Sequence, residues 1–152
     1  RVILMNEISH EGTHVHDCHS HSHDHHEQAS ISRRINNTMI TLNAYEQDDA
    51  SVISLEWKAC KDARQTEVLL KQLFKNIARD ITEQNGIIGH IKASMERNEV
   101  IIISLTDTEA MKKEALSPNI QIHAAVIALC IDKNTLAQIV ESALDSSPLF
   151  SI

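Results

Sequence analysis

The chain has 152 residues, of which 42% are hydrophobic, and this length suits one domain or one domain with a tail. Aromatic residues make up only 3% of the chain, so a core must be built mainly from aliphatic side chains. The formal charge is −7 with neutral histidine, which argues against nucleic acid as a partner because phosphate binding needs clustered cations. No apolar run approaches the ~18 residues of a membrane span, so no membrane partner is expected.

Residues 1–35 are predicted to form a short strand over 2–6 followed by a flexible histidine-rich segment. Residues 9–34 offer little to bury, so they cannot offset the entropy lost on ordering unless a metal or a partner orders them. Eight of the ten histidines lie between His10 and His26, and neutral imidazole is the commonest protein ligand for transition metals. The predicted metal ligands are His10, His14, His16, Cys18, His19, His21, His23, His25 and His26.

The histidines of this tract are mostly two residues apart, as in His14-Val-His16. Alternate residues of an extended chain point the same way, so such a pair converges on an ion only where the backbone bends around it. Nitrogen and oxygen donors suit zinc, nickel or cobalt. The tract therefore predicts several overlapping sites with modest selectivity and fast exchange, rather than one prearranged tetrahedral site.

Residues 36–147 are predicted to be a folded α+β domain. The β-rich runs 38–46 and 51–59 flank a turn and predict a hairpin, in which Ile53, Leu55 and Trp57 share the buried face of the second strand. A helix is predicted to begin at Asp62 and to end near 85–86, where Gly86 supplies the left-handed conformation.

The second half of this domain is predicted to hold a further hairpin, a short helix, a strand and a longer helix. The hairpin joins 86–95 to 100–106 through a polar turn at 96–99, and the short helix lies within 106–116. Residues 119–131 are apolar on both faces in their second half and suit a central strand covered on both sides, and 133–144 carry aliphatic side chains at helical spacing. The predicted fold is α+β, a mainly antiparallel sheet of about five strands with two helices on one face, ferredoxin-like or related.

The three cysteines are widely spaced and odd in number, which argues against a disulfide framework and favours a cytoplasmic location. Cys130 lies in an apolar run and is predicted to be a core residue, whereas Cys60 could be buried or exposed. His90 is predicted to share a face with Ile88 and Lys92. If its strand neighbours that of His123, the two imidazoles could approach each other with Glu56 as a third donor, and an enzymatic function would need these three to form a catalytic metal site.

The opening strand Val2–Met5 with Asn6 and Glu7, followed by the histidine tract, resembles the CobW-type family of metallochaperone GTPases. That resemblance implies a C-terminal α+β region and a GTPase domain or a recipient metalloprotein as partner. The phosphate loop and the Cys-x-Cys-Cys motif of that family are absent from the sequence. On this resemblance the chain would be an accessory portion and, by itself, not an enzyme.

Two functional hypotheses follow. The first is a metal-binding accessory domain of metallochaperone type, which collects zinc, nickel or cobalt on the histidine tract and uses the folded domain for docking or for homo-oligomer formation. The alternative is a protein-interaction or ligand-binding α+β module in which the tract is incidental. No phosphate loop, nucleophile motif or other catalytic constellation is found in the sequence.

Metal binding by the tract should weaken steeply as the solution is acidified. Protonation of all ten histidines would move the formal charge from −7 to +3, mostly within about a unit of pH 6.5, the ordinary histidine pKa. Protons and metal compete for the same lone pairs, so zinc bound at pH 7.5 should be largely released near pH 5.5. Calorimetric titration at the two pH values measures this, and equal affinity at both would contradict imidazole ligation.

Overall fold

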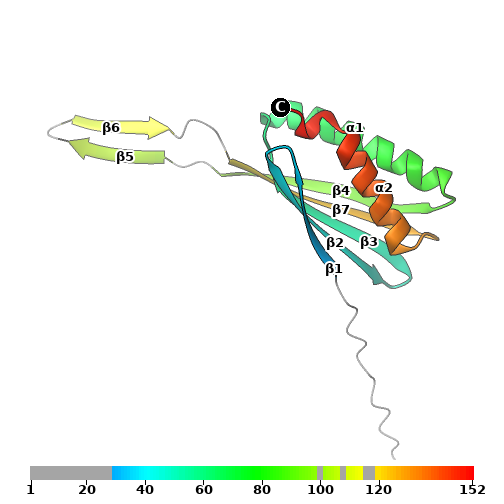
Figure 1. Ribbon diagram of the computed structural model, residues 1–152. Helices are drawn as coiled ribbons and strands as arrows, with labels where there is room; N and C mark the ends of the chain where they lie inside the picture. Colours follow the sequence, from blue (N-terminus) through cyan, green and yellow to red (C-terminus); the bar gives the residue numbers. More distant parts are fainter. Residues whose placement is uncertain (1–28, 99–100, 107–108, 115–118) are drawn as a thin grey trace, which may run out of the picture.

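The computed structural model describes residues 29–98 and 119–152, together with the backbone of 101–106 and 109–114. Within these residues a five-stranded antiparallel sheet carries two helices on one face (Figure 1). The elements are β1 Ala29–Ile35, β2 Thr38–Gln47, β3 Ala50–Lys58, α1 Ala63–Glu83, β4 Ile87–Asn98, β5 Ile101–Thr106, β6 Glu109–Glu114, β7 Asn119–Leu129, α2 Lys133–Ser146 and the 3₁₀ turn η1 Pro148–Phe150.

The strand order of the main sheet is β1-β2-β3-β7-β4. Since β3 and β4 both run antiparallel to β7, they are parallel to each other, and α1 connects them across the sheet. This arrangement is a split β-α-β unit with β7 inserted between its two strands, as in ferredoxin-like folds. The predicted α+β class, the antiparallel sheet and the placement of two helices on one face are confirmed.

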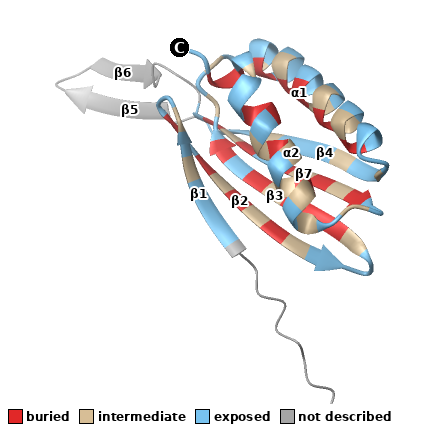
Figure 2. Ribbon diagram, turned by 45° about the vertical axis from the view of Figure 1, so that its right-hand side comes forward, coloured by how far each residue is buried: buried red, intermediate tan, exposed pale blue. Residues whose placement is uncertain are grey.

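The core lies between the sheet and the two helices and is almost entirely aliphatic, as the composition predicts (Figure 2). Along β3 the side chains of Ile53, Leu55 and Trp57 are 0–2% exposed, which confirms the predicted buried face. The inward positions of β7 alternate in the same way, with Ile122 and Val126 fully buried, while the other face of β7 is exposed or half-buried, so the predicted cover on both sides is wrong. Each such pattern places one face of a strand against the helices and leaves the other face free.

The side chain of an aspartate caps the N-terminus of each helix. The Asp62 carboxylate accepts a hydrogen bond from the Gln65 backbone N–H, which confirms the predicted start of α1. Asp132 caps α2 in the same way, and the hydrogen bonds that Thr135 donates to it lower the pKa of the Asp132 carboxyl.

The end of α1 differs from the prediction. The left-handed residue is Asn85, with φ of 59°, whereas Gly86 has no positive φ. Asparagine tolerates this conformation because its short polar side chain satisfies local backbone groups. Gly86 is needed instead for close approach, since a Cβ there would lie 2.8 Å from Ile81 Cγ2.

The predicted hairpin from 86–95 and 100–106 is wrong. The strand β4 continues through the expected turn as far as Asn98 and pairs with β7, while β5 pairs with β6 in a separate two-stranded sheet. The short helix predicted within 106–116 is also wrong, because 109–114 is the strand β6. Alternating polar residues in this stretch fit a ribbon as well as a helix, and only the pairing of Asn98 with Asn119 reveals that β5 and β6 are an insertion between β4 and β7.

The folded unit is longer at both ends than the predicted range 36–147. The strand β1, within the stretch predicted to be flexible, pairs with β2 through a two-residue turn in which Asn36 has φ of 51°. An ion pair from Arg33 to Asp145 joins β1 to α2. At the other end, Leu149 and Phe150 of η1 are 1–2% exposed, and the Phe150 ring meets Trp57 edge-on at 5.6 Å between centroids.

The buried side chains of α1 should contribute more to the free energy of unfolding of the domain than its exposed side chains do. Ile77→Ala, at a position that is 0% exposed, should lower the free energy of unfolding by about 2–5 kcal/mol because it leaves a cavity under the sheet. The matched control on the same helix is Val68→Ala, at a position 61% exposed, which should change it by less than about 0.5 kcal/mol. Urea unfolding followed by circular dichroism compares the two, and equal losses would contradict this packing.

Candidate functional site

The nine predicted metal ligands all belong to the histidine tract and lie outside the described residues, as does the predicted strand over 2–6. The first described residue is Ala29, where the edge strand β1 begins, three positions after His26. Three residues span at most about 10 Å, so the tract joins the fold at the start of this edge strand.

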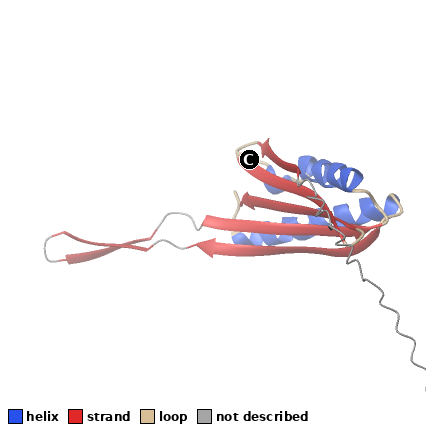
Figure 3. Ribbon diagram, turned by 90° about the horizontal axis from the view of Figure 1, so that it is seen from below, coloured by secondary structure: helices blue, strands red, loops and turns tan. Residues whose placement is uncertain are grey.

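Both helices lie on one side of the main sheet, so the other face of the sheet is not covered by them (Figure 3). The strand registers place most of the polar side chains of the strands on this uncovered face. The pairing of β3 with β7 sets Ser54, Glu56 and Lys58 of β3 opposite Ala125, His123 and Gln121 of β7. We call this surface the open face. Cross-strand partners on one face of a sheet lie about 5 Å apart at Cβ, close enough for their side chains to interact.

Glu56 and His123 are neighbours on the open face. The Nδ1 atom of His123 lies 4.0 Å from Oε2 of Glu56, and Gln121 Nε2 donates a hydrogen bond of 3.1 Å to Oε1 of the same carboxylate. Both side chains of the ion pair are about half exposed. The expected approach of Glu56 to His123 is therefore confirmed, and the carboxylate is shared between an imidazole and an amide.

His90 does not join this pair. It lies opposite Ile127, whereas Ser94 lies opposite His123, so the two histidines are four residues apart along the sheet. At about 3.3 Å per residue this separation is roughly 13 Å, too far for one metal ion with ligand distances near 2 Å. The second site suggested for His90, His123 and Glu56 is wrong.

A β-bulge changes the facing of residues at the start of β4. The register shifts between Ile88 and His90, so that Ile88 pairs with the buried Ala128 on the helix side while His90 lies on the open face. The prediction that Ile88 and His90 share a face is therefore wrong. Gly89 sits at the bulge, where a Cβ would come within 3.1 Å of the Ile127 carbonyl oxygen.

No group of three or more histidine, cysteine, aspartate or glutamate side chains is placed to hold a metal ion in the described part of the chain. The sheet offers at most two converging donors, Glu56 and His123. Structural zinc sites use four protein ligands and catalytic ones use three, so this pair is short of either.

Cys130 is exposed, and the prediction that it is a core residue is wrong. The strand β7 ends at Leu129, and Cys130 takes φ of 58° at the turn into α2. This turn interrupts the alternation that buries Val126 and Ala128. Cys60 is also an exposed free thiol, and its Sγ donates to the Leu149 carbonyl at 3.2 Å.

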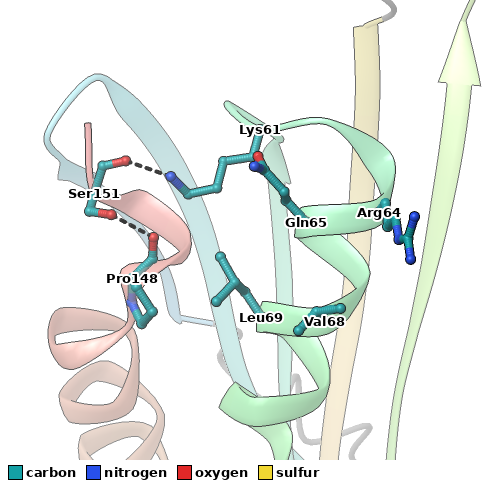
Figure 4. A pocket seen from close by; sticks show the side chains of 7 residues that line it. All are labelled: Lys61, Arg64, Gln65, Val68, Leu69, Pro148 and Ser151. Carbon is teal, nitrogen blue, oxygen red and sulfur yellow. Dashed lines mark hydrogen bonds between the residues drawn. The ribbon is translucent and has the colours of Figure 1, made fainter.

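A hollow of about 450 Å³ lies beside the first turns of α1, against the C-terminal segment (Figure 4). Val68, Leu69 and Pro148 provide its apolar lining. Lys61 Nζ donates to the Ser151 carbonyl at 3.0 Å, and Arg64 extends away from that segment. The side chains that line the hollow include no carboxylate, thiol or imidazole, and the Ser151 hydroxyl donates a hydrogen bond of 2.8 Å to the Pro148 carbonyl.

Among the described residues, neither helix combines the length and the apolar character needed to cross a membrane.

A family model described as iSTAND, inactive STAND, matches residues 5–124. The match includes the histidine tract and extends from β1 into β7, and it stops before α2. No curated protein matches the chain. The resemblance to the CobW-type family is therefore wrong, because the region that carried it lies inside the match to a different family.

The two described thiols should differ in reactivity. With Cys18 and Cys60 changed to serine, Cys130 should react with Ellman's reagent in the native protein about as fast as in the unfolded chain, since it is exposed. With Cys18 and Cys130 changed instead, Cys60 should react more slowly, because its thiol is engaged with Leu149. Reaction of Cys130 only after unfolding would contradict its position in the turn.

Proposed function

The chain belongs to the iSTAND family, described as inactive STAND, and we propose that it is a non-catalytic module. On this proposal residues 10–26 collect zinc, nickel or cobalt ions. The folded α+β domain supports the tract and docks it to a recipient metalloprotein. The description of the family as inactive agrees with the lack of a phosphate loop in the sequence.

The observation that carries this proposal is the distribution of imidazoles. Eight of the ten histidines fall within residues 10–26, together with Cys18 and several carboxylates. The other two, His90 and His123, lie on the open face and do not converge. A rigid sheet cannot bring donors 13 Å apart to one ion, whereas donors two residues apart in sequence can meet around an ion wherever the chain bends.

The position of the histidine tract directly before β1 supports the proposal that the folded domain carries the tract. Residue 26 is three positions from β1, which lies at one end of the strand order and is joined to α2 by the pair Arg33–Asp145. Ions held next to such an edge are close to any partner that binds there. A cytoplasmic location is part of the proposal, supported by the free thiols of Cys60 and Cys130.

A second candidate is an interaction module that works through the open face. It is favoured by two exposed apolar side chains on the open face: Met39, 48% exposed, which lines the same hollow as Glu56, and Leu129, 37% exposed, at the far end of β7. The two candidates differ in one respect: binding of a partner through the open face should be insensitive to a metal chelator, whereas metal transfer should not.

Replacing the eight tract histidines by asparagine should remove most metal binding. Nine donors fill about two four-coordinate sites, so the unchanged chain should hold about two zinc ions and the variant fewer than one. The matched control is the double variant His90→Asn and His123→Asn, which should keep the full stoichiometry. Equilibrium dialysis followed by elemental analysis counts the ions, and circular dichroism checks that each protein is folded.

The proposal fails if the variant without the eight tract histidines binds zinc like the unchanged chain, or if the His90/His123 double variant loses the ions. If the unchanged chain itself binds no zinc, nickel or cobalt near neutral pH, metal collection is overturned and the open-face candidate remains.

A further inference from the structure

We propose that the chain forms a two-fold symmetric dimer in which β4 pairs antiparallel with β4 of a second copy, centred on Ser94. This inference does not depend on metal binding. It joins the two five-stranded sheets into one continuous sheet, with the helices of both copies on the same face.

The strand β4 is an open edge. It lies at one end of the strand order, pairs with β7 alone among the described strands and is 12 residues long. Ile87 and Ile88 are 56% and 40% exposed, and Ala93 is exposed although it lies on the helix side of the sheet. A long edge strand is a template for pairing with another strand.

The regular part of β4 sets the register of the pairing. The bulge at Gly89 interrupts the ladder with β7, after which His90–Asn98 pairs without a break. These nine residues have Ser94 at their midpoint. A two-fold axis through Ser94 therefore pairs the whole regular segment with itself and leaves the bulged end outside the interface.

This register is complementary in charge. It places Lys92 opposite Glu96 of the second copy, and the symmetry repeats the pair. Within one chain the two residues are four apart along a strand, about 13 Å, so they cannot pair with each other. No ion pair of either residue is present among the described residues. Opposite charges directly across two strands stabilise the pairing.

The same register extends the core on the helix side. Ala93 lies opposite Met95 of the second copy, and Met95 is partly buried against the core of its own domain. Met95 would thus lose its remaining exposed surface to the small side chain of the partner copy. The Lys92–Glu96 pairs then lie on the open face of the ladder and the Ala93–Met95 pairs on the helix side, as alternation requires.

The opposite edge of the sheet lacks these features. The strand β1 is seven residues long and contains Arg33 and Arg34 but no acidic residue. Arg33 is already paired with Asp145, and pairing of β1 with itself would bring Arg34 of both copies onto one face with no acidic residue of the strand opposite, which is one way that edges are kept unpaired. The structure thus distinguishes one self-complementary edge from one that is not.

The test is the oligomeric state of the full chain in excess chelator, so that metal ions bridging the tract cannot link copies. Sedimentation equilibrium at up to about 1 mM chain should show a monomer–dimer equilibrium. Lys92→Glu and Glu96→Lys should each weaken dimerisation by about tenfold or more, because each places like charges opposite at both symmetric positions. The double variant restores opposite charges and should recover the dissociation constant of the unchanged chain.

Two charge reversals elsewhere serve as matched controls. Arg34→Glu lies on the β1 edge and Lys58→Glu on the open face, and neither should change the dissociation constant. A strictly monomeric chain overturns the proposal, and so does a dimer that is insensitive to both single reversals or that fails to recover in the double variant. Disruption by Arg34→Glu alone would assign the interface to β1 and would also overturn it.

Discussion

The pairing of β7 with both β3 and β4 is the constraint on which the rest of the molecule depends. It makes β3 and β4 parallel, so the chain must cross the sheet between them, and α1 is that crossover. It also builds the centre of the core, where Ile53, Ile122 and Val126 are 0% exposed beneath the helices. Burial of aliphatic surface is the main favourable term in folding. Because β7 lies between β3 and β4, the side chains of α1, α2 and the sheet bury this surface in one common core.

The same ladder decides how polar groups are distributed. Side chains on the open face are held at fixed spacings along and across strands, so Glu56 and His123 meet while His90 stays two rows away. A surface of this kind can recognise a shape but cannot gather three or four donors around an ion. Metal capture and structural support therefore belong to different parts of the chain in the proposed function. The match to the iSTAND family covers the histidine tract and the folded domain as far as β7 in one range.

The two edge strands of the sheet, β1 and β4, differ in length and in the side chains that they carry. The strand β1 is short and is joined to α2 by the Arg33–Asp145 pair. The strand β4 is the longest strand, and after its bulge it alternates charges of both signs with small or apolar side chains. Residues 101–106 and 109–114 are inserted between β4 and β7 without entering the main sheet.

The local sequence pattern was enough to predict those helices and strands whose determining residues lie close together in the chain. The hairpin of β2 and β3, the Asp62 cap, both long helices and the central position of β7 follow from alternation, helical spacing and turn residues within a few positions of one another. The histidine tract is likewise plain from composition, although its residues lie outside the described part. Only the tertiary structure decided that β4 passes through a polar turn-like stretch to pair with β7, that β1 joins the sheet, that a bulge turns His90 away from Ile88, and that Cys130 is exposed. Each of these depends on pairing between residues distant in sequence, and the free energy of such pairing can outweigh local preference.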